Sequence, residues 1–287
     1  MISELETKGY CIVENVLSEE DIEYCKKEFR SWQNTILEKD HSISAHGIYK
    51  FHQVGHTKFA WYIRTRPTVQ DVFKKLWSTD DLIVSFDGSC YIPKDMKRRD
   101  TCWVHTDQAP SSTGLQCYQG FVSLTENKER TIVLYEGTHK IHERYFKEKN
   151  NTSKKNWQLI DKNDVKDMEE HKRVLHVPAG ALVLWDSRVF HQNQYGNPGE
   201  ERMVQYVCFL PKAHPKNTLS MQKKRMKYFI ERRTTSHWPV PLRVNGLQPQ
   251  VYGDESKKID YEKLKQIQEE TGVSDLSAYM EEIKKLI

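Results

Sequence analysis

The sequence predicts a mainly β protein, an antiparallel sandwich or jelly roll with helices on its flanks. Segments with strand character gather between residues 82 and 211, whereas helical periodicity lies before and after them. Strands and helices therefore do not alternate along the chain, as they would in a parallel sheet built from βαβ units. No internal repeat or low-complexity linker interrupts the 287 residues. We therefore expect one domain over residues 1–287.

The N-terminal part is expected to be helical over residues 18–78, after a short strand within residues 8–16. Ser18 stands where a helix N-cap should, and the acidic residues that follow it suit the positive end of the helix dipole. The helix that begins there should run to about Leu37, because apolar residues recur on one face of it. A second helix is expected over residues 69–77.

The β core is predicted from apolar runs that are bounded by turn residues or alternate with polar residues. These runs cover residues 82–93, 114–125, 130–137, 176–186 and 202–211. The polar stretch at residues 146–173 is expected to form loops or short helices. A basic insert or lid follows at residues 212–253, and the tail at residues 255–287 has the periodicity of helices.

The composition excludes several classes of protein. Hydrophobic residues make up 37% and charged residues 29% of the chain, which is typical of a globular protein and not of a disordered one. No apolar run approaches the roughly 18 residues of a membrane span, and the N-terminus lacks the pattern of a secretory signal. The six cysteines form no CxxC pair, which favours reduced thiols over zinc sites or disulfides. We therefore expect a cytoplasmic protein.

His105 and Asp107, in CWVHTDQ, form the first half of a candidate metal site. Residues two apart in extended backbone point to the same face, so both side chains can reach one ion. HxD triplets arise by chance in many proteins, and the prediction therefore depends on a second half further along the chain. A turn and an apolar strand lead to His191, and Arg202 comes 11 residues later. Two histidines and one carboxylate on one face suit a non-haem iron(II) oxygenase.

These motifs, in this order, resemble the phytanoyl-CoA dioxygenase-like (PhyH) family of Fe(II)/2-oxoglutarate-dependent oxygenases. HxD, AGALVLWDSRVFHQNQYGNPGEER, GYCIVENVLSEEDI and GTHK carry the resemblance, which covers residues 8–211. It implies a double-stranded β-helix (jelly-roll) core with iron bound by His105, Asp107 and His191. It also implies Arg202 as the anchor of 2-oxoglutarate, whose distal carboxylate the guanidinium fork can hold. Fe(II), 2-oxoglutarate and O2 would then hydroxylate a substrate, with release of succinate and CO2.

Gln116 and Tyr118 are further candidates for contacts with 2-oxoglutarate or substrate. They alternate along the strand after the HxD loop, so both could face the barrel interior, where the resemblance places polar residues. The other interpretation is that both are polar residues of the core whose hydrogen bonds are satisfied within the protein. The expected substrate is a small or medium-sized organic molecule, with an anionic one among the alternatives.

Residues 212–243 are strongly basic, with nine Lys or Arg residues against one acidic residue and with Tyr228, Phe229 and Trp238 interleaved. Basic and aromatic residues together can follow a phosphate backbone and stack on bases. They can also hold an anionic small molecule, and a third interpretation is a solvated helix. The alternative to an enzyme is therefore an anion- or nucleic-acid-binding module on an oxygenase-like fold.

Overall fold

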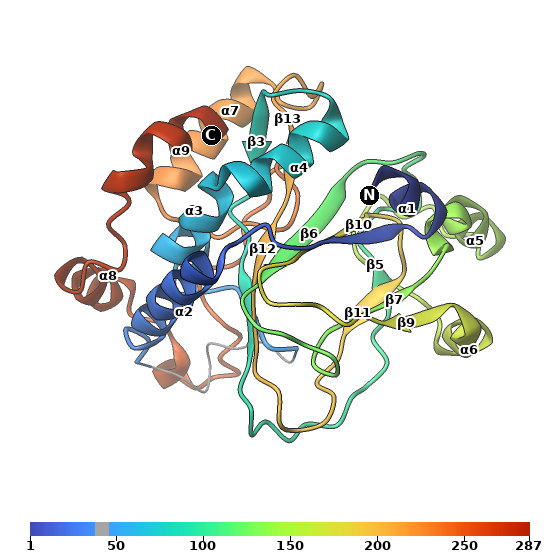
Figure 1. Cartoon of the computed structure of the whole chain (residues 1–287), viewed down its shortest axis with the longest axis horizontal. Helices are drawn as coiled ribbons and strands as arrows, with labels where there is room; N and C mark the ends of the chain where they lie inside the picture. Colours follow the sequence, from blue (N-terminus) through green and yellow to red (C-terminus); the bar gives the residue numbers. More distant parts are fainter. Residues whose placement is uncertain (38–45) are drawn as a thin grey trace. The chain divides into compact units, whose positions relative to one another are not determined.

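The computed structural model describes residues 1–37 and 46–287, which divide into two compact units (Figure 1). The first unit comprises Met1–Glu14 and Ile92–Arg202, and the second comprises Asn15–Tyr91 and Met203–Ile287. Residues 38–45 of the expected N-terminal helical region lie outside the described residues. The expectation of a single domain stays a prediction, and each unit is described by itself.

The first unit contains antiparallel strands in two groups. In one group, β10 (Leu182–Asp186) lies between β1 (Tyr10–Val13) and β6 (Tyr118–Ser123). The other group is a five-stranded sheet with the order β8-β5-β11-β7-β9. Its strands are β8 (Gln158–Leu159), β5 (His105–Thr106), β11 (His191–Asn193), β7 (Ile132–Tyr135) and β9 (Lys172–Val174). The helices of this unit are short: α1 (Ile2–Thr7), η3 (Thr138–Lys140), α5 (His142–Glu148), α6 (Lys162–Asp167) and η4 (Glu169–His171).

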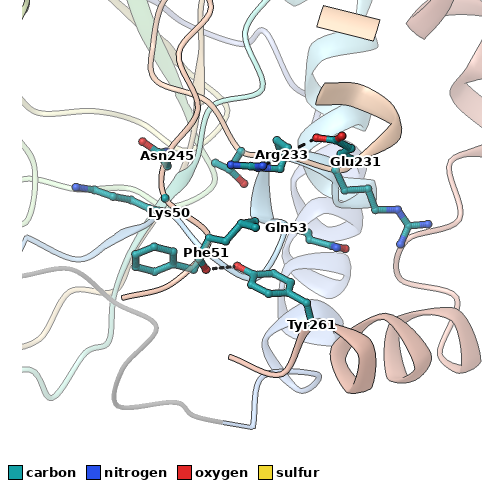
Figure 2. Close-up of a pocket in the computed structure, with 11 residues that line it drawn as sticks. Lys50, Phe51, Gln53, Glu231, Arg233, Asn245 and Tyr261 are labelled. Atoms are coloured by element: carbon teal, nitrogen blue, oxygen red, sulfur yellow. Dashed lines mark hydrogen bonds and ion pairs between the residues drawn. The ribbon is translucent and has the colours of Figure 1, made fainter. Parts of the chain in front are cut away.

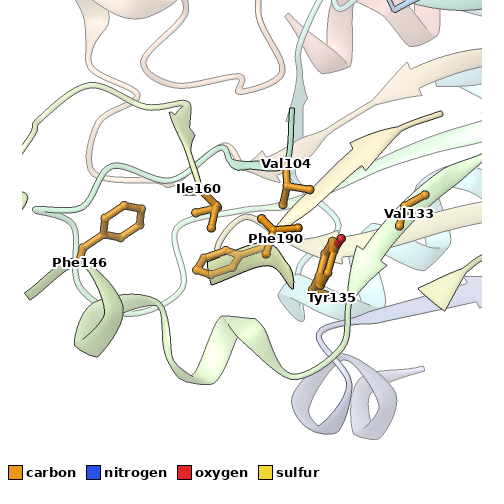
Figure 3. Close-up of a cluster of buried hydrophobic side chains, with 7 residues drawn as sticks. Val104, Val133, Tyr135, Phe146, Ile160 and Phe190 are labelled. Atoms are coloured by element: carbon orange, nitrogen blue, oxygen red, sulfur yellow. The ribbon is translucent and has the colours of Figure 1, made fainter. Parts of the chain in front are cut away.

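A hydrophobic cluster packs against one face of the five-stranded sheet (Figure 3). Its members come from strands, loops and helices: Val104, Val133, Tyr135, Phe146, Ile160, Val165 and Phe190. Val104 and Phe190 are 1% and 0% exposed, and they directly precede His105 and His191. Neighbouring residues of an extended chain point to opposite faces. Burial of Val104 and Phe190 in the cluster therefore turns both imidazoles to the other face.

The second unit contains most of the helix. Its helices are α2 (Glu19–Gln33), η2 (Val54–His56), α3 (Lys58–Thr65), α4 (Pro67–Trp77), α7 (Leu219–Ile230), η5 (Glu255–Lys257), α8 (Tyr261–Glu270), η6 (Ser277–Tyr279) and α9 (Met280–Leu286). Its strands are β2 (Ile48–Tyr49), β3 (Leu82–Val84), β4 (Ser89–Ile92), β12 (Arg202–Val207) and β13 (Phe209–Pro211), where β4 and β12 each cross the unit boundary by one residue. Within this unit β2 pairs with β4, and β3 pairs with β13. The N-terminal and C-terminal helices were both expected.

The start of α2 confirms the predicted helix cap. The Ser18 hydroxyl accepts a hydrogen bond from the backbone of Asp21, and the Asp21 carboxylate accepts one from the backbone of Ser18. This reciprocal capping box satisfies two donors that the first turn would otherwise leave unpaired. The helix ends at Gln33, earlier than expected, after burying one face that includes Phe29 and Trp32.

The predicted strand at residues 82–93 is instead two strands, β3 and β4. The backbone between them passes close to its neighbours, since a Cβ atom on Gly88 would lie 2.1 Å from the carbonyl oxygen of Tyr49. The buried Arg64 donates hydrogen bonds to the carbonyls of Gly55 and Asp87 and so binds this connection to helix α3. Antiparallel strands flanked by helices confirm the predicted fold class. Among the described residues, no helix has both the length and the apolar character needed to cross a bilayer.

Burial of His56 predicts acid sensitivity in the second unit. The side chain is buried, and burial lowers its pKa from 6.5 to about 3. Because the folded pKa lies below the unfolded value, the unfolded chain binds the additional proton first, and stability is lost as the pH falls below about 6.5. We predict that His56 lowers the free energy of unfolding by about 2 kcal/mol when the pH falls from 7 to 5.

Urea denaturation at the two pH values measures this cost. His56→Gln should reduce the difference in the free energy of unfolding between the two pH values by that amount. His176→Gln should leave this difference unchanged, because His176 is a surface imidazole that is bonded to Glu126. Equal pH dependence in the wild type and His56→Gln would refute the assignment.

Candidate metal centre

The first unit brings together the three residues that the sequence singled out. Potential ligand atoms of His105, Asp107 and His191 all lie within 4.8 Å of one another, and all three residues are buried. His105 and His191 are direct cross-strand partners on β5 and β11, and their ring centroids are 4.4 Å apart. Cross-strand partners point to the same face of a sheet. The two imidazoles therefore meet because of the register between two strands that lie far apart in the sequence.

Backbone carbonyls orient both imidazoles. His105 Nδ1 lies 3.1 Å from the carbonyl oxygen of Trp103, and His191 Nδ1 lies 2.9 Å from that of Val189. A carbonyl oxygen can only accept a hydrogen bond, so each Nδ1 carries the proton and each Nε2 presents a lone pair. The two Nε2 atoms lie 3.8 and 3.3 Å from oxygens of Asp107. Metal-binding histidines commonly have this arrangement, with the second nitrogen held by a carbonyl.

Gln119 holds the carboxylate in place. Its Nε2 donates a hydrogen bond of 3.0 Å to Asp107 Oδ2, and the side chain is 1% exposed. One ion with bonds of about 2.0–2.2 Å can reach atoms at these separations. Two imidazole nitrogens and one carboxylate oxygen form the donor set that suits a non-haem iron(II) ion.

Three tryptophans lie around the imidazoles. Trp103 stacks on His105 with a centroid distance of 4.8 Å and an interplanar angle of 19°, and Trp157 lies 5.4 Å from the same ring. Trp185 lies 5.3 Å from the ring of His191. These rings limit the rotation of the imidazoles. They also give the site apolar walls, so that water competes less for the polar atoms of the triad.

Arg202 is buried on the same side of β6 as the triad. Its guanidinium carbon lies 5.2 Å from the ring centroid of Phe121, and the residue is 1% exposed. Phe121 and Gln119 are two residues apart on β6 and so share the face on which Gln119 contacts Asp107. In the described chain, Arg202 Nη1 and Nη2 have no hydrogen-bond partner. A buried guanidinium with two unpaired nitrogens fits a carboxylate that binds both of them.

The structure does not bring Gln116 and Tyr118 to the triad. Gln116 precedes β6 and donates a hydrogen bond to the carbonyl of Thr113. Tyr118 lies next to Gln119 on β6 and therefore on the opposite face, where it lines a separate cavity beside Arg188. Gln116 lies outside the strand on which it was expected to alternate with Tyr118, and the Tyr118 side chain lies on the face of β6 opposite to Gln119. Contacts of Gln116 and Tyr118 with 2-oxoglutarate stay a prediction that this placement disfavours.

Gln119 and Trp157 are the neighbours of the triad that sequence reasoning missed. Neither belongs to a motif. Gln119 would have been found by assigning the other face of the strand to the interior, and Trp157 lies 52 positions from His105 in the sequence (157 − 105). Only the pairing of β8 with β5 brings Trp157 close to the metal face.

The basic segment 212–243 is packed onto the second unit. Arg225 is fully buried, and it donates hydrogen bonds to the side chain of Asn217 and to the carbonyl of Pro239. Phe229 packs against the ring of Trp61 at 5.6 Å, and Trp238 is 7% exposed. These groups therefore support the core and are not presented for stacking on bases.

A small cavity lies beside the end of α7 in the same unit (Figure 2). Lys50, Glu231 and Arg233 are among the residues that line it. Figure 2 shows the Lys50 side chain extending away from the other two, and Arg233 lies 3.9 Å from the Glu231 carboxylate. These charges do not converge on a common point, as an anion site would require.

Comparisons with known proteins agree with this geometry. The family model of phytanoyl-CoA dioxygenase (PhyH) matches residues 5–194. "Ava biosynthesis cluster protein O" of Aspergillus versicolor is 32% identical over 238 residues, which cover 73% of this chain and 76% of the relative. The "Putative phytanoyl-CoA dioxygenase" of Dictyostelium discoideum is 25% identical over 287 residues and covers 79% of each chain.

Solved structures share the fold. HygX from Streptomyces hygroscopicus, with nickel and 2-oxoglutarate bound, superposes with a TM-score of 0.53 at 10% identity, covering 74% of this chain and 86% of that chain. The non-heme alpha ketoglutarate dependent carbocyclase SnoK from nogalamycin biosynthesis superposes with a TM-score of 0.51 at 20% identity, covering 73% and 82%. The similarity confirms the predicted jelly-roll core.

Loss of the Gln119 hydrogen bond should weaken the metal site. We predict that Gln119→Leu lowers the affinity for Co(II) or Mn(II) by about 10- to 100-fold, as is typical when a partner of a ligand is removed. Isothermal titration calorimetry under anaerobic conditions measures this. Gln116→Leu is the matched control, since that amide bonds only locally, and it should retain wild-type affinity. An equal loss of metal affinity in both variants would contradict a metal site on the face of β6 that carries Gln119.

Proposed function

Since the chain belongs to the phytanoyl-CoA dioxygenase family, and is therefore a 2-oxoglutarate-dependent non-haem iron oxygenase, we propose that it hydroxylates a small organic molecule. His105, Asp107 and His191 hold the iron in this proposal, and Arg202 anchors 2-oxoglutarate. The observation that carries it is the unpaired guanidinium of Arg202, buried on the side of β6 from which Gln119 reaches Asp107.

Each side chain has a defined task in the proposed reaction. Backbone carbonyls accept hydrogen bonds from the Nδ1 atoms of the two imidazoles, and this tautomer would present both Nε2 atoms to the metal. Gln119 fixes the rotation of the Asp107 carboxylate. Arg202 would hold the distal carboxylate of 2-oxoglutarate with its two unpaired nitrogens, which would orient the molecule as well as increase its affinity.

When bound, iron(II), 2-oxoglutarate and O2 supply the oxidant: one oxygen atom enters a substrate C–H bond, and the other enters succinate as CO2 is released. The protein contributes position and exclusion. The buried triad and its tryptophan walls keep bulk water from the reacting atoms. They also limit which part of a substrate can approach the metal.

A small organic substrate is supported by the relatives and neighbours. The Aspergillus versicolor protein is named for a biosynthesis cluster, and the SnoK structure is named for nogalamycin biosynthesis. A cytoplasmic location is also proposed, because the six cysteines form no CxxC pair and this spacing suits a reducing compartment. The alternative function, an anion- or nucleic-acid-binding module, draws no support from segment 212–243, whose Arg225, Phe229 and Trp238 serve the core.

Succinate formation in air tests the proposed reaction directly. The wild type with Fe(II) and 2-oxoglutarate should form succinate, and a panel of small organic molecules should contain compounds that stimulate it. His191→Ala should lower the rate at least about 100-fold, since an open coordination site that has lost a ligand no longer holds the metal. Wild-type rates in His191→Ala, or no succinate from the wild type with any compound, would refute the proposal.

Replacement of Arg202 should have opposite effects on stability and on co-substrate binding. We predict that Arg202→Met weakens 2-oxoglutarate binding about 100-fold, because two charge-assisted hydrogen bonds are lost. The same change should preserve or raise the melting temperature without ligand, because it removes a buried charge that has no partner. Thermal unfolding with and without 2-oxoglutarate measures both effects.

Arg130→Met is the matched control. Arg130 is as deeply buried as Arg202, but it donates hydrogen bonds to the carbonyls of Pro93, Met96 and Asn197. Its removal leaves those carbonyls unsatisfied, so the melting temperature should fall. A comparable fall in Arg202→Met, with co-substrate binding intact, would make Arg202 a structural residue.

A further inference from the structure

An exposed apolar pair lies at the edge strand β8, beside the imidazoles. Leu159 belongs to β8 and is 56% exposed, and Trp157 directly precedes the strand and is 48% exposed. Leu159 is the direct cross-strand partner of His105, which is in turn the partner of His191. Cross-strand partners share a face, so Leu159 lies in the same row as the two candidate ligands.

Trp157 is held in an unusual conformation next to this row. Its backbone has φ +67°, in the left-handed region that bulky residues rarely occupy. Its ring centroid lies 5.4 Å from that of His105, at an interplanar angle of 34°. The preceding Asn156 accepts a hydrogen bond from the backbone of Ala109, which fixes this part of the chain to the HxD loop. Such strain persists where the surrounding structure enforces it, and it is most common at functional sites.

We propose that Trp157 and Leu159 form the substrate subsite beside the iron and hold a planar apolar ring of the substrate. This inference rests on the proposed function, since it needs a metal at His105. A half-exposed indole offers a flat face for offset or edge-on stacking, and the Leu159 side chain supplies an apolar flank.

The small size of the pair and its surroundings determine the kind of occupant. Lys155 is exposed, and Asn156 and Gln158 are half-buried, so polar groups frame the two apolar side chains. An occupant that matches this frame is a ring with polar substituents, and the row Leu159–His105–His191 directs such a ring along the metal face. An extended protein partner would need a much larger surface.

Paramagnetic relaxation tests the subsite independently of turnover. Mn(II) replaces iron(II), the protein is saturated with 2-oxoglutarate, and the probe is indole. Relaxation of water protons reports the bound Mn(II), and relaxation of the indole protons reports a ring held close to it. We expect strong relaxation of indole in the wild type and in Trp157→Phe. In Trp157→Ala the affinity for indole should fall about two- to tenfold, the range of one aromatic contact.

Leu159→Ala should also weaken indole binding, whereas Val174→Ala should not. Val174 is similarly exposed, but it lies on β9 at the far edge of the sheet and pairs with Val133 of the hydrophobic cluster. Wild-type indole affinity in Trp157→Ala, or no relaxation of indole while Mn(II) is bound, would overturn the subsite and leave the metal site intact. Failure of the wild type to bind Mn(II) would instead overturn the proposed function.

Discussion

The pairing of His105 with His191 across β5 and β11 is the constraint on which the rest of the site depends. Val104 and Phe190, one position before each histidine, are buried in the hydrophobic cluster on the opposite face. A slip of one residue in either strand would expose these side chains and bury an imidazole among apolar groups. The free energy of core packing therefore also fixes the direction of both imidazoles, and Asp107 follows because it is two residues from His105.

The guanidinium of Arg202 differs from the guanidinium groups of the other buried arginines in its hydrogen bonding. Arg64, Arg130 and Arg225 are as deeply buried, and each binds backbone carbonyls that need a donor. The guanidinium of Arg202 lies over the ring of Phe121, and two of its nitrogens have no hydrogen-bond partner in the described chain. An unpaired buried charge destabilises a fold, so its presence beside the triad is consistent with selection for a ligand and not for stability.

Much of the fold and the triad could be predicted from the sequence, because those signals are local. The Ser18 cap, the individual strand segments and the HxD spacing each lie within one short segment, whereas His191 was predicted from its own segment and a family resemblance, and the strand register brings it to His105. The choice of Gln116 and Tyr118 over Gln119 depended on which face of β6 is interior, and only the pairing of β6 with β10 decides that. The placement of Trp157 and the burial of Arg225 depend on contacts between distant segments. No single-segment pattern encodes them.

We propose that one metal ion binds to His105, Asp107 and His191 while Arg202 binds the co-substrate. An anomalous difference map from crystals grown without oxygen, with Fe(II) and 2-oxoglutarate, tests it most directly. We expect one iron peak within about 2.3 Å of both Nε2 atoms and of an Asp107 oxygen. We also expect the distal carboxylate of 2-oxoglutarate on the Arg202 guanidinium. An iron peak elsewhere, or a co-substrate that does not contact Arg202, would contradict it.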